Sequence, residues 1–141
     1  SRNTLLQYLQ LLDRAELIST MRAASKGVSA LQKPDKIYLN NPNLLYALAP
    51  QKVDVGTLRE TFFFNQLSEL TNEGAFPPKL ELPKKGDFAY TALDEQYLFE
   101  IGGPNKEAKQ IGVKDNHFVV IDTTLSGHEK RIPLWMFGLL Y

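Results

Sequence analysis

The sequence contains no cysteine, and this absence excludes several kinds of chemistry at once. A chain without thiols can form no disulfide bond, no thiolate zinc site and no cysteine nucleophile. Its two histidines, His117 and His128, do not stand at the spacing of a metal-binding pair. We therefore interpret both histidines as surface residues.

The chain also lacks net charge, because 16 Lys and Arg residues balance 16 Asp and Glu residues. No global field therefore indicates a nucleic-acid or membrane partner. Residues 1–50 nevertheless hold six basic against three acidic residues, and residues 51–141 hold ten against thirteen. The basic bias at the front suits DNA contact, although such a bias also arises without any function.

Long apolar runs and known nucleotide motifs are absent as well. No run approaches the roughly 20 residues of a membrane span, and no secretory signal opens the chain, so we expect a cytoplasmic protein without a membrane partner. There is no G-x-x-x-x-G-K-[ST] loop for an ATPase, and the pair Gly102 and Gly103 is too short for a dinucleotide fingerprint. Ser126 does not lie in a nucleophile elbow.

The front of the chain combines one helical pattern with two strand patterns. Apolar residues recur at helical spacing over residues 4–18, which predicts an amphipathic helix. Because this helix begins almost at Ser1, we expect its packing partners upstream. Strands are predicted near residues 17–24 and over 36–39, joined by a basic connection. Residues 1–50 are thus interpreted as the C-terminal part of a winged helix, with a small α/β cap as the alternative.

Residues 51–141 predict a second unit, of α/β type. One helix is expected before this unit, over residues 40–48, and a longer one within it, over residues 56–71, after a linker. Short strands follow near Leu80 and over residues 86–92, 96–102 and 117–122. The apolar tail, residues 131–141, is expected to be buried.

The predicted strands over 86–92 and 96–102 read as a hairpin that turns at Leu93 and Asp94. In this register paired residue numbers sum to 187, so Phe88 faces Phe99 and Tyr90 faces Tyr97. Aromatic cross-strand pairs of this kind stabilise a ribbon. The aromatic pattern therefore predicts the register.

The same register places Asp87 directly opposite Glu100. Two carboxylates on residues whose Cβ atoms lie about 5 Å apart repel one another unless a cation offsets the repulsion. Mg²⁺ prefers carboxylate oxygens as ligands. The alternative is a solvated sheet face. The position of Glu60 favours the metal-site interpretation over the solvated face. Glu60 lies on the apolar flank of the predicted helix, where an unpaired carboxylate is costly to bury. Glu60, Asp87 and Glu100 would suit metal-assisted phosphodiester hydrolysis.

Five segments together resemble the C-terminal domain of unknown function carried by AAA-type ATPases of bacteria and archaea. They are KPDKIYLNNPNLLYAL, GTLRETFFFNQL, GDF, FEIGGPNKEAKQI and the terminal IPLWMFGLLY. Proteins of the group that it resembles combine three parts: a P-loop ATPase, a winged helix and a domain related to the PD-(D/E)XK nuclease fold. The resemblance implies a restriction-endonuclease-like mixed sheet flanked by helices over residues 51–141, with ATP bound only by an upstream ATPase part.

The resemblance also assigns roles to residues. Glu60 matches the helix acid of the nuclease superfamily, Asp87 the hairpin acid and Glu100 the acid that opens the E-x-K element. Gln110 matches a glutamine that some members place on the following helix. Gly102 departs from the pattern, because it stands where the E-x-K lysine is expected. Two later lysines are candidates to reach back in its place, namely Lys106 and Lys109.

The resulting hypothesis is a DNA-associated, nuclease-like module of a larger P-loop ATPase, with Mg²⁺ or Mn²⁺ held by Asp87, Glu100 and Glu60. Its partners would be DNA and the parent's own ATPase domain. The alternative is a catalytically inactive domain that docks a partner through an exposed apolar patch around Trp135 and Phe137. In that case the acids would form a water-filled cluster.

Overall fold

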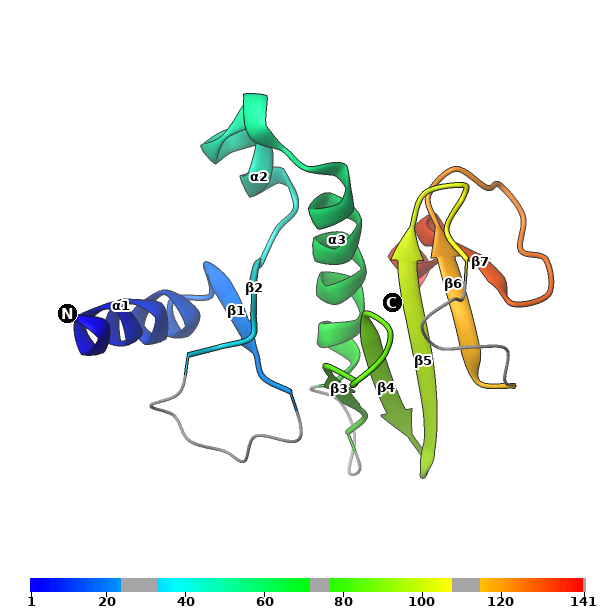
Figure 1. Cartoon of the computed structure of the whole chain (residues 1–141), viewed down its shortest axis with the longest axis horizontal. Coiled ribbons are helices and arrows are strands. Elements are labelled where there is room, and N and C mark those ends of the chain that lie inside the picture. Colours follow the sequence, from blue (N-terminus) through cyan, green and yellow to red (C-terminus); the bar gives the residue numbers. More distant parts are fainter. Residues whose placement is uncertain (24–32, 72–76, 108–114, 141) are drawn as a thin grey trace.

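A computed structural model describes residues 1–23, 33–71, 77–107 and 115–140, which fold into helices and two β-sheets (Figure 1). Within these ranges no helix has both the length and the apolar character needed to cross a lipid bilayer. The elements, in chain order, are α1 (Arg2–Arg14), β1 (Ile18–Met21), β2 (Lys36–Leu39), α2 (Asn43–Leu48), η2 (Pro50–Lys52), α3 (Val55–Leu70), β3 (Lys79–Glu81), β4 (Phe88–Ala92), β5 (Glu95–Gly102), β6 (His117–Ile121), β7 (Arg131–Pro133) and η3 (Leu134–Leu139).

Helix α1 is shorter than the sequence pattern predicts, because it ends at Arg14 and not near residue 18. Glu16 takes a positive φ of 55°. The Leu17 amide then donates to the Leu12 carbonyl and the Glu16 amide to the Asp13 carbonyl. These two bonds form a Schellman motif, in which glycine usually takes the left-handed position. The chain thereby leaves the helix early and enters β1, which pairs antiparallel with β2 as predicted.

The second sheet is mixed and has five strands in the order β3-β4-β5-β6-β7. Strands β3, β4 and β5 pair antiparallel, whereas β5, β6 and β7 pair parallel. The predicted hairpin register is confirmed, because Phe88 pairs with Phe99 and Tyr90 with Tyr97. Leu93 and Asp94 form the turn with φ values of 50° and 64°, as a two-residue hairpin loop with two left-handed residues requires.

Helix α3 covers one face of this sheet, as Figure 1 shows. The Phe63 ring is fully buried, and its centroid lies 5.1 Å from that of Phe88, 5.2 Å from Phe99 and 4.6 Å from Phe137. Because side chains alternate along a strand, Phe99 faces α3 and Glu100 faces the opposite side of the sheet. The aromatic core therefore fixes the direction in which Glu100 points.

The small sheet shares this core. Met21 of β1 and Tyr38 of β2 belong to the same buried cluster as Phe63 and Phe88. The Tyr38 ring stacks on Phe64 with centroids 4.8 Å apart. Strand β2 is therefore held against α3.

The apolar tail is only partly buried, which corrects the expectation that it is buried throughout. Leu134 and Phe137 are buried, three residues apart on η3. A 3-10 helix has three residues per turn, so one side of η3 faces the core and the other sides do not. The exposed members of this segment are Trp135, Met136, Leu139 and Leu140.

Candidate functional site

Asp87, Glu100 and Lys106 come together near the end of β5. Glu100 lies two residues before the strand ends, Asp87 directly precedes β4, and Lys106 follows β5 after a short turn. The Lys106 ammonium nitrogen Nζ lies 3.5 Å from Asp87 Oδ2 and 3.6 Å from Glu100 Oε2. One ammonium group thus contacts two carboxylates at ion-pair distance.

Asp87 does not pair across the ladder with Glu100 as the hairpin register predicts. The regular pairing of β4 with β5 begins at Phe88. The Asp87 amide instead donates to the Phe99 carbonyl at 2.9 Å, and Asp87 Oδ2 accepts from the Ile101 amide at 2.7 Å. The Asp87 carboxylate is therefore oriented by the backbone of β5 itself.

Glu100 is the most deeply placed acid of this group, with 1% of its surface exposed. Burying a carboxylate is costly unless cations or hydrogen-bond donors compensate it. The side chains of Asp87 and Lys106 are also mostly buried, at 16% and 27% exposure. Charge interactions at this site are consequently stronger than those of ion pairs on the surface.

Gly102 explains how Lys106 reaches the acids. A Cβ atom on Gly102 would lie 2.6 Å from Lys106 Cβ, 2.7 Å from Cγ and 2.8 Å from Cδ. The aliphatic stem of Lys106 thus occupies the space that a side chain at position 102 would fill. Lys109 and Gln110, the other predicted site residues of this segment, lie outside the described residues.

Glu60 belongs to a separate cluster. Its Oε2 accepts a 2.7 Å bond from Lys36 Nζ and a 3.0 Å bond from the Tyr38 hydroxyl. Burial, followed by the negative charge of Glu60, raises the pKa of Tyr38. No three acidic or imidazole groups within the described ranges are arranged to hold a metal ion, so the predicted convergence of Glu60 with Asp87 and Glu100 is not found there.

A divalent cation can nevertheless fit the remaining pair of acids. Mg²⁺ commonly binds through one or two carboxylates and completes its coordination with water and substrate phosphate oxygens. Asp87 and Glu100 already reach one shared positive group, the Lys106 ammonium. The donor set is therefore suited to a hard cation that is only partly coordinated by protein.

Sequence reasoning missed a second charged pair beside a cavity of about 410 Å³. Arg59 of α3 donates its Nε hydrogen to Asp122 Oδ2 at 2.6 Å, and both residues line this cavity together with Tyr46 and Trp135. The one available signal is that Asp122 directly follows the buried strand β6. Ligands often bind where parallel strands end.

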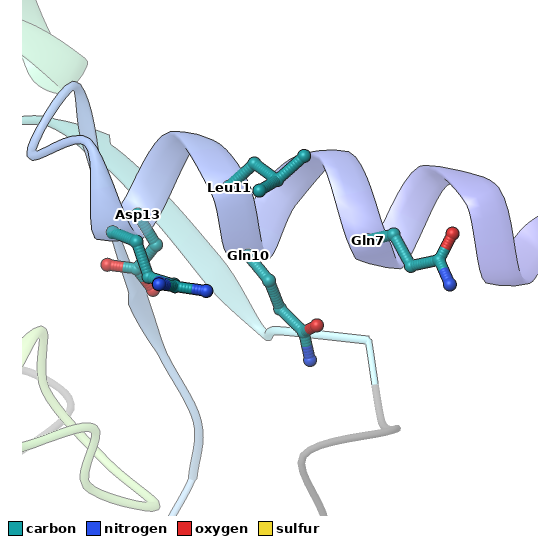
Figure 2. A pocket seen from close by; sticks show the side chains of 5 residues that line it. Gln7, Gln10, Leu11 and Asp13 are labelled. Carbon is teal, nitrogen blue, oxygen red and sulfur yellow. The ribbon is translucent and has the colours of Figure 1, made fainter.

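A further cavity of about 620 Å³ lies against α1 and gathers none of the predicted site residues. Figure 2 shows Gln7 and Gln10 projecting from the same side of this helix. Leu11, Asp13 and Arg14 complete its lining. These polar side chains do not converge on a common point, so this open groove suggests no chemistry.

Comparison with family models, with curated proteins and with solved structures finds no match.

Proposed function

We propose that this chain is a nuclease-like module that hydrolyses phosphodiester bonds with a divalent cation held by Asp87 and Glu100. The observation that carries the proposal is the position of Lys106, whose ammonium contacts both carboxylates. Its stem takes the space above Gly102, which is the position where a PD-(D/E)XK nuclease carries its lysine. Lys106 thus supplies the missing positive charge from the turn after the strand.

Each residue has a separate role in this proposal. A bound Mg²⁺ or Mn²⁺ would polarise the phosphate and activate a water molecule. Asp87, held in place by the Ile101 amide, and the buried Glu100 are the protein ligands. Lys106 orients the attacking water and stabilises the negative charge that develops on the phosphate oxygens. Glu60 is left out of this ligand set, because no three acids within the described residues are arranged to hold a metal ion.

The wider setting of the module rests on the sequence resemblance. Residues 1–50 would be the C-terminal part of a winged helix, and residues 51–141 the restriction-endonuclease-like domain. The module would act on DNA as part of a larger P-loop ATPase that binds ATP elsewhere. The five-stranded mixed sheet and the helix packed on it are compatible with this plan.

The test is metal-dependent cleavage of plasmid and single-stranded DNA, with RNA as a parallel substrate. We expect cleavage with Mg²⁺ or Mn²⁺ and none with a chelator. Asp87→Asn and Glu100→Gln should each lower the rate by at least about a hundredfold, because each removes one charged ligand. Asp94→Asn is the matched control, since it makes the same change in the turn of the same hairpin.

A binding measurement accompanies the cleavage assay. Mn²⁺ should raise the melting temperature of the native protein and of Asp94→Asn, because a ligand that binds only the folded state stabilises it. Asp87→Asn should fold normally and lose this response. Absence of any response in the native protein, together with absence of cleavage, would contradict the metal site.

The second candidate function is a catalytically inactive docking domain for the parent's ATPase part. Its supporting observation is the exposed apolar surface of Met136, Leu139 and Leu140 at the end of the chain, since such surface often marks a protein contact. Phe137 is buried and cannot contribute to this surface. In this case Met136→Ser should weaken binding of the ATPase part, and Asp87→Asn should leave that binding unchanged.

A further inference from the structure

The cavity of about 410 Å³ lies between α2, α3 and η3. Val55, Leu58, Arg59 and Phe62 line it from α3, and their spacing places them on one face of that helix. A volume of this size is typical of sites for small organic ligands. The wall is mostly apolar, and the charged pair of Arg59 and Asp122 interrupts it.

The Arg59 guanidinium is oriented by one hydrogen bond, and its other donors remain unused by the described residues. Its Nε hydrogen goes to Asp122, and its two terminal nitrogens have no hydrogen-bond partner among the residues that the structure describes. A guanidinium group fixed through Nε can present the remaining donors to an oxygen anion as a planar fork. Asp122 Oδ1 is buried and likewise accepts no hydrogen bond within the described ranges. A ligand donor that reached this oxygen would relieve its burial cost.

Two aromatic side chains stand beside this pair. Tyr46 of α2 is 50% exposed and Trp135 of η3 is 47% exposed, although both line the cavity. Half-exposed aromatic rings at a cavity wall can stack on a nucleobase, whatever its sequence identity. The cavity therefore combines stacking surface with a donor group for an anion.

The glycine pair at the end of β5, Gly102 and Gly103, connects this cavity to the acid site. Lys106 lies against Gly102, and the Arg59 guanidinium lies 3.4 to 3.6 Å from where a Cβ of Gly103 would be. Successive residues of an extended chain point to opposite faces, so the two cations approach the end of β5 from two sides. A strand of nucleic acid that crossed this end would meet both of them.

We propose that this cavity binds one nucleotide of a nucleic-acid strand, with its base against Tyr46 and Trp135 and its phosphate on Arg59. The proposal rests on the proposed nuclease function, because the bound nucleotide would lie next to the phosphodiester that is cleaved. An anion is favoured over a purely apolar occupant because an arginine with open donors would be desolvated without compensation by apolar groups.

The sequence supplies its own reporter, since Trp135 is the only tryptophan. Adenosine 5′-monophosphate, adenosine and inorganic phosphate are titrated into the full chain while tryptophan fluorescence is recorded. We expect a saturable change with the nucleotide and about tenfold weaker binding of adenosine, which lacks the charge-assisted bonds. Phosphate alone should compete with the nucleotide.

Two variants test the contacts. Arg59→Lys should weaken binding of the nucleotide by about tenfold but leave adenosine binding unchanged, because lysine keeps the charge and loses the planar fork. Arg14→Lys on α1 is the matched control. Tyr46→Ala changes a half-exposed side chain and should weaken both ligands by about tenfold through lost stacking, so it serves if Arg59→Lys does not fold.

The outcomes separate this proposal from the nuclease proposal. Equal affinity for adenosine and its monophosphate, or no saturable fluorescence change at millimolar nucleotide, would overturn the nucleotide site. Asp87→Asn should keep the fluorescence change, so loss of cleavage with intact binding concerns the acid site alone. Cleavage without nucleotide binding would overturn only the cavity's role.

Discussion

Two lysine–carboxylate clusters in the described part of the chain differ in the distance between the ammonium nitrogen and the carboxylate oxygens. Lys36 and the Tyr38 hydroxyl both bond to Glu60, at 2.7 and 3.0 Å. Lys106 instead stands between Glu100 and a second acid, at 3.6 and 3.5 Å. The first cluster has hydrogen-bond lengths, and the second has only ion-pair lengths.

This difference indicates which cluster is structural. A carboxylate that accepts two short bonds from one strand holds that strand in place, which suits the contact of β2 with α3. Under the proposed function, the Lys106 ammonium, which two carboxylates share beyond hydrogen-bond length, would shift when a cation or a phosphate enters. Bond length and sharing, more than the mere presence of an ion pair, therefore distinguish the candidate site from the structural contact.

Replacing the two lysines by methionine is expected to give the largest contrast. Lys106→Met removes the cation shared by two mostly buried acids and should lower the free energy of unfolding by about 3 kcal/mol. Lys36→Met breaks a partly exposed pair and should cost about 1 kcal/mol. Urea denaturation of both variants measures the difference.

Mn²⁺ provides the control for this contrast. The cation should restore part of the stability lost in Lys106→Met, because it takes the place of the ammonium between Asp87 and Glu100. No comparable restoration is expected in Lys36→Met. Equal losses in the two variants, without any rescue by Mn²⁺, would show that the clusters do not differ as proposed.

The neighbouring glycines allow a second, smaller contrast. Gly102→Ala places a methyl group within 2.6 to 2.8 Å of the Lys106 stem, so the lysine must move, at a cost of about 2 kcal/mol. Gly103→Ala meets Arg59 at 3.4 Å or more and should change stability by less than about 0.5 kcal/mol. Urea denaturation again gives both values, and cleavage should fall only in Gly102→Ala. A stable Gly102→Ala variant would mean that Lys106 is not held over this position.

The sequence was most informative where a pattern is local. Alternating aromatic residues specified the register of the β4–β5 hairpin, because a shift by one residue would turn every side chain to the other face. The end of α1 was predicted wrongly since Glu16 adopts a conformation that the sequence signals only through glycine or asparagine.

The candidate site was only partly predictable for a related reason. Glu100 lies on a regular strand, so its position follows from periodicity, whereas Asp87 directly precedes β4 and leaves the predicted pairing. The reach of Lys106 depends on the path of the turn after Gly103, which no periodicity describes. The bond between Arg59 and Asp122 joins residues 63 positions apart, and a single sequence does not reveal a contact at that separation.

Apart from the comparison variants Lys36→Met and Gly103→Ala, the smallest expected effect concerns the Tyr38 hydroxyl, which helps to close the structural cluster. Tyr38→Phe removes the bond to Glu60 and should lower the free energy of unfolding at neutral pH by about 1 kcal/mol.

Burial and Glu60 raise the pKa of Tyr38 above its ordinary value of 10.0, so the folded protein keeps this proton while the unfolded chain loses it. The contribution of Tyr38 is therefore present below pH 10 and is lost as the pH rises further. Urea denaturation from neutral to alkaline pH should show the advantage of the native protein over Tyr38→Phe shrinking above this value. Tyr8→Phe on α1 is the matched control, because it makes the same change at an exposed ring. If the difference in free energy of unfolding between the native protein and Tyr38→Phe stayed constant with pH, the Tyr38 hydroxyl would not be buried and bonded to Glu60 as the structure shows.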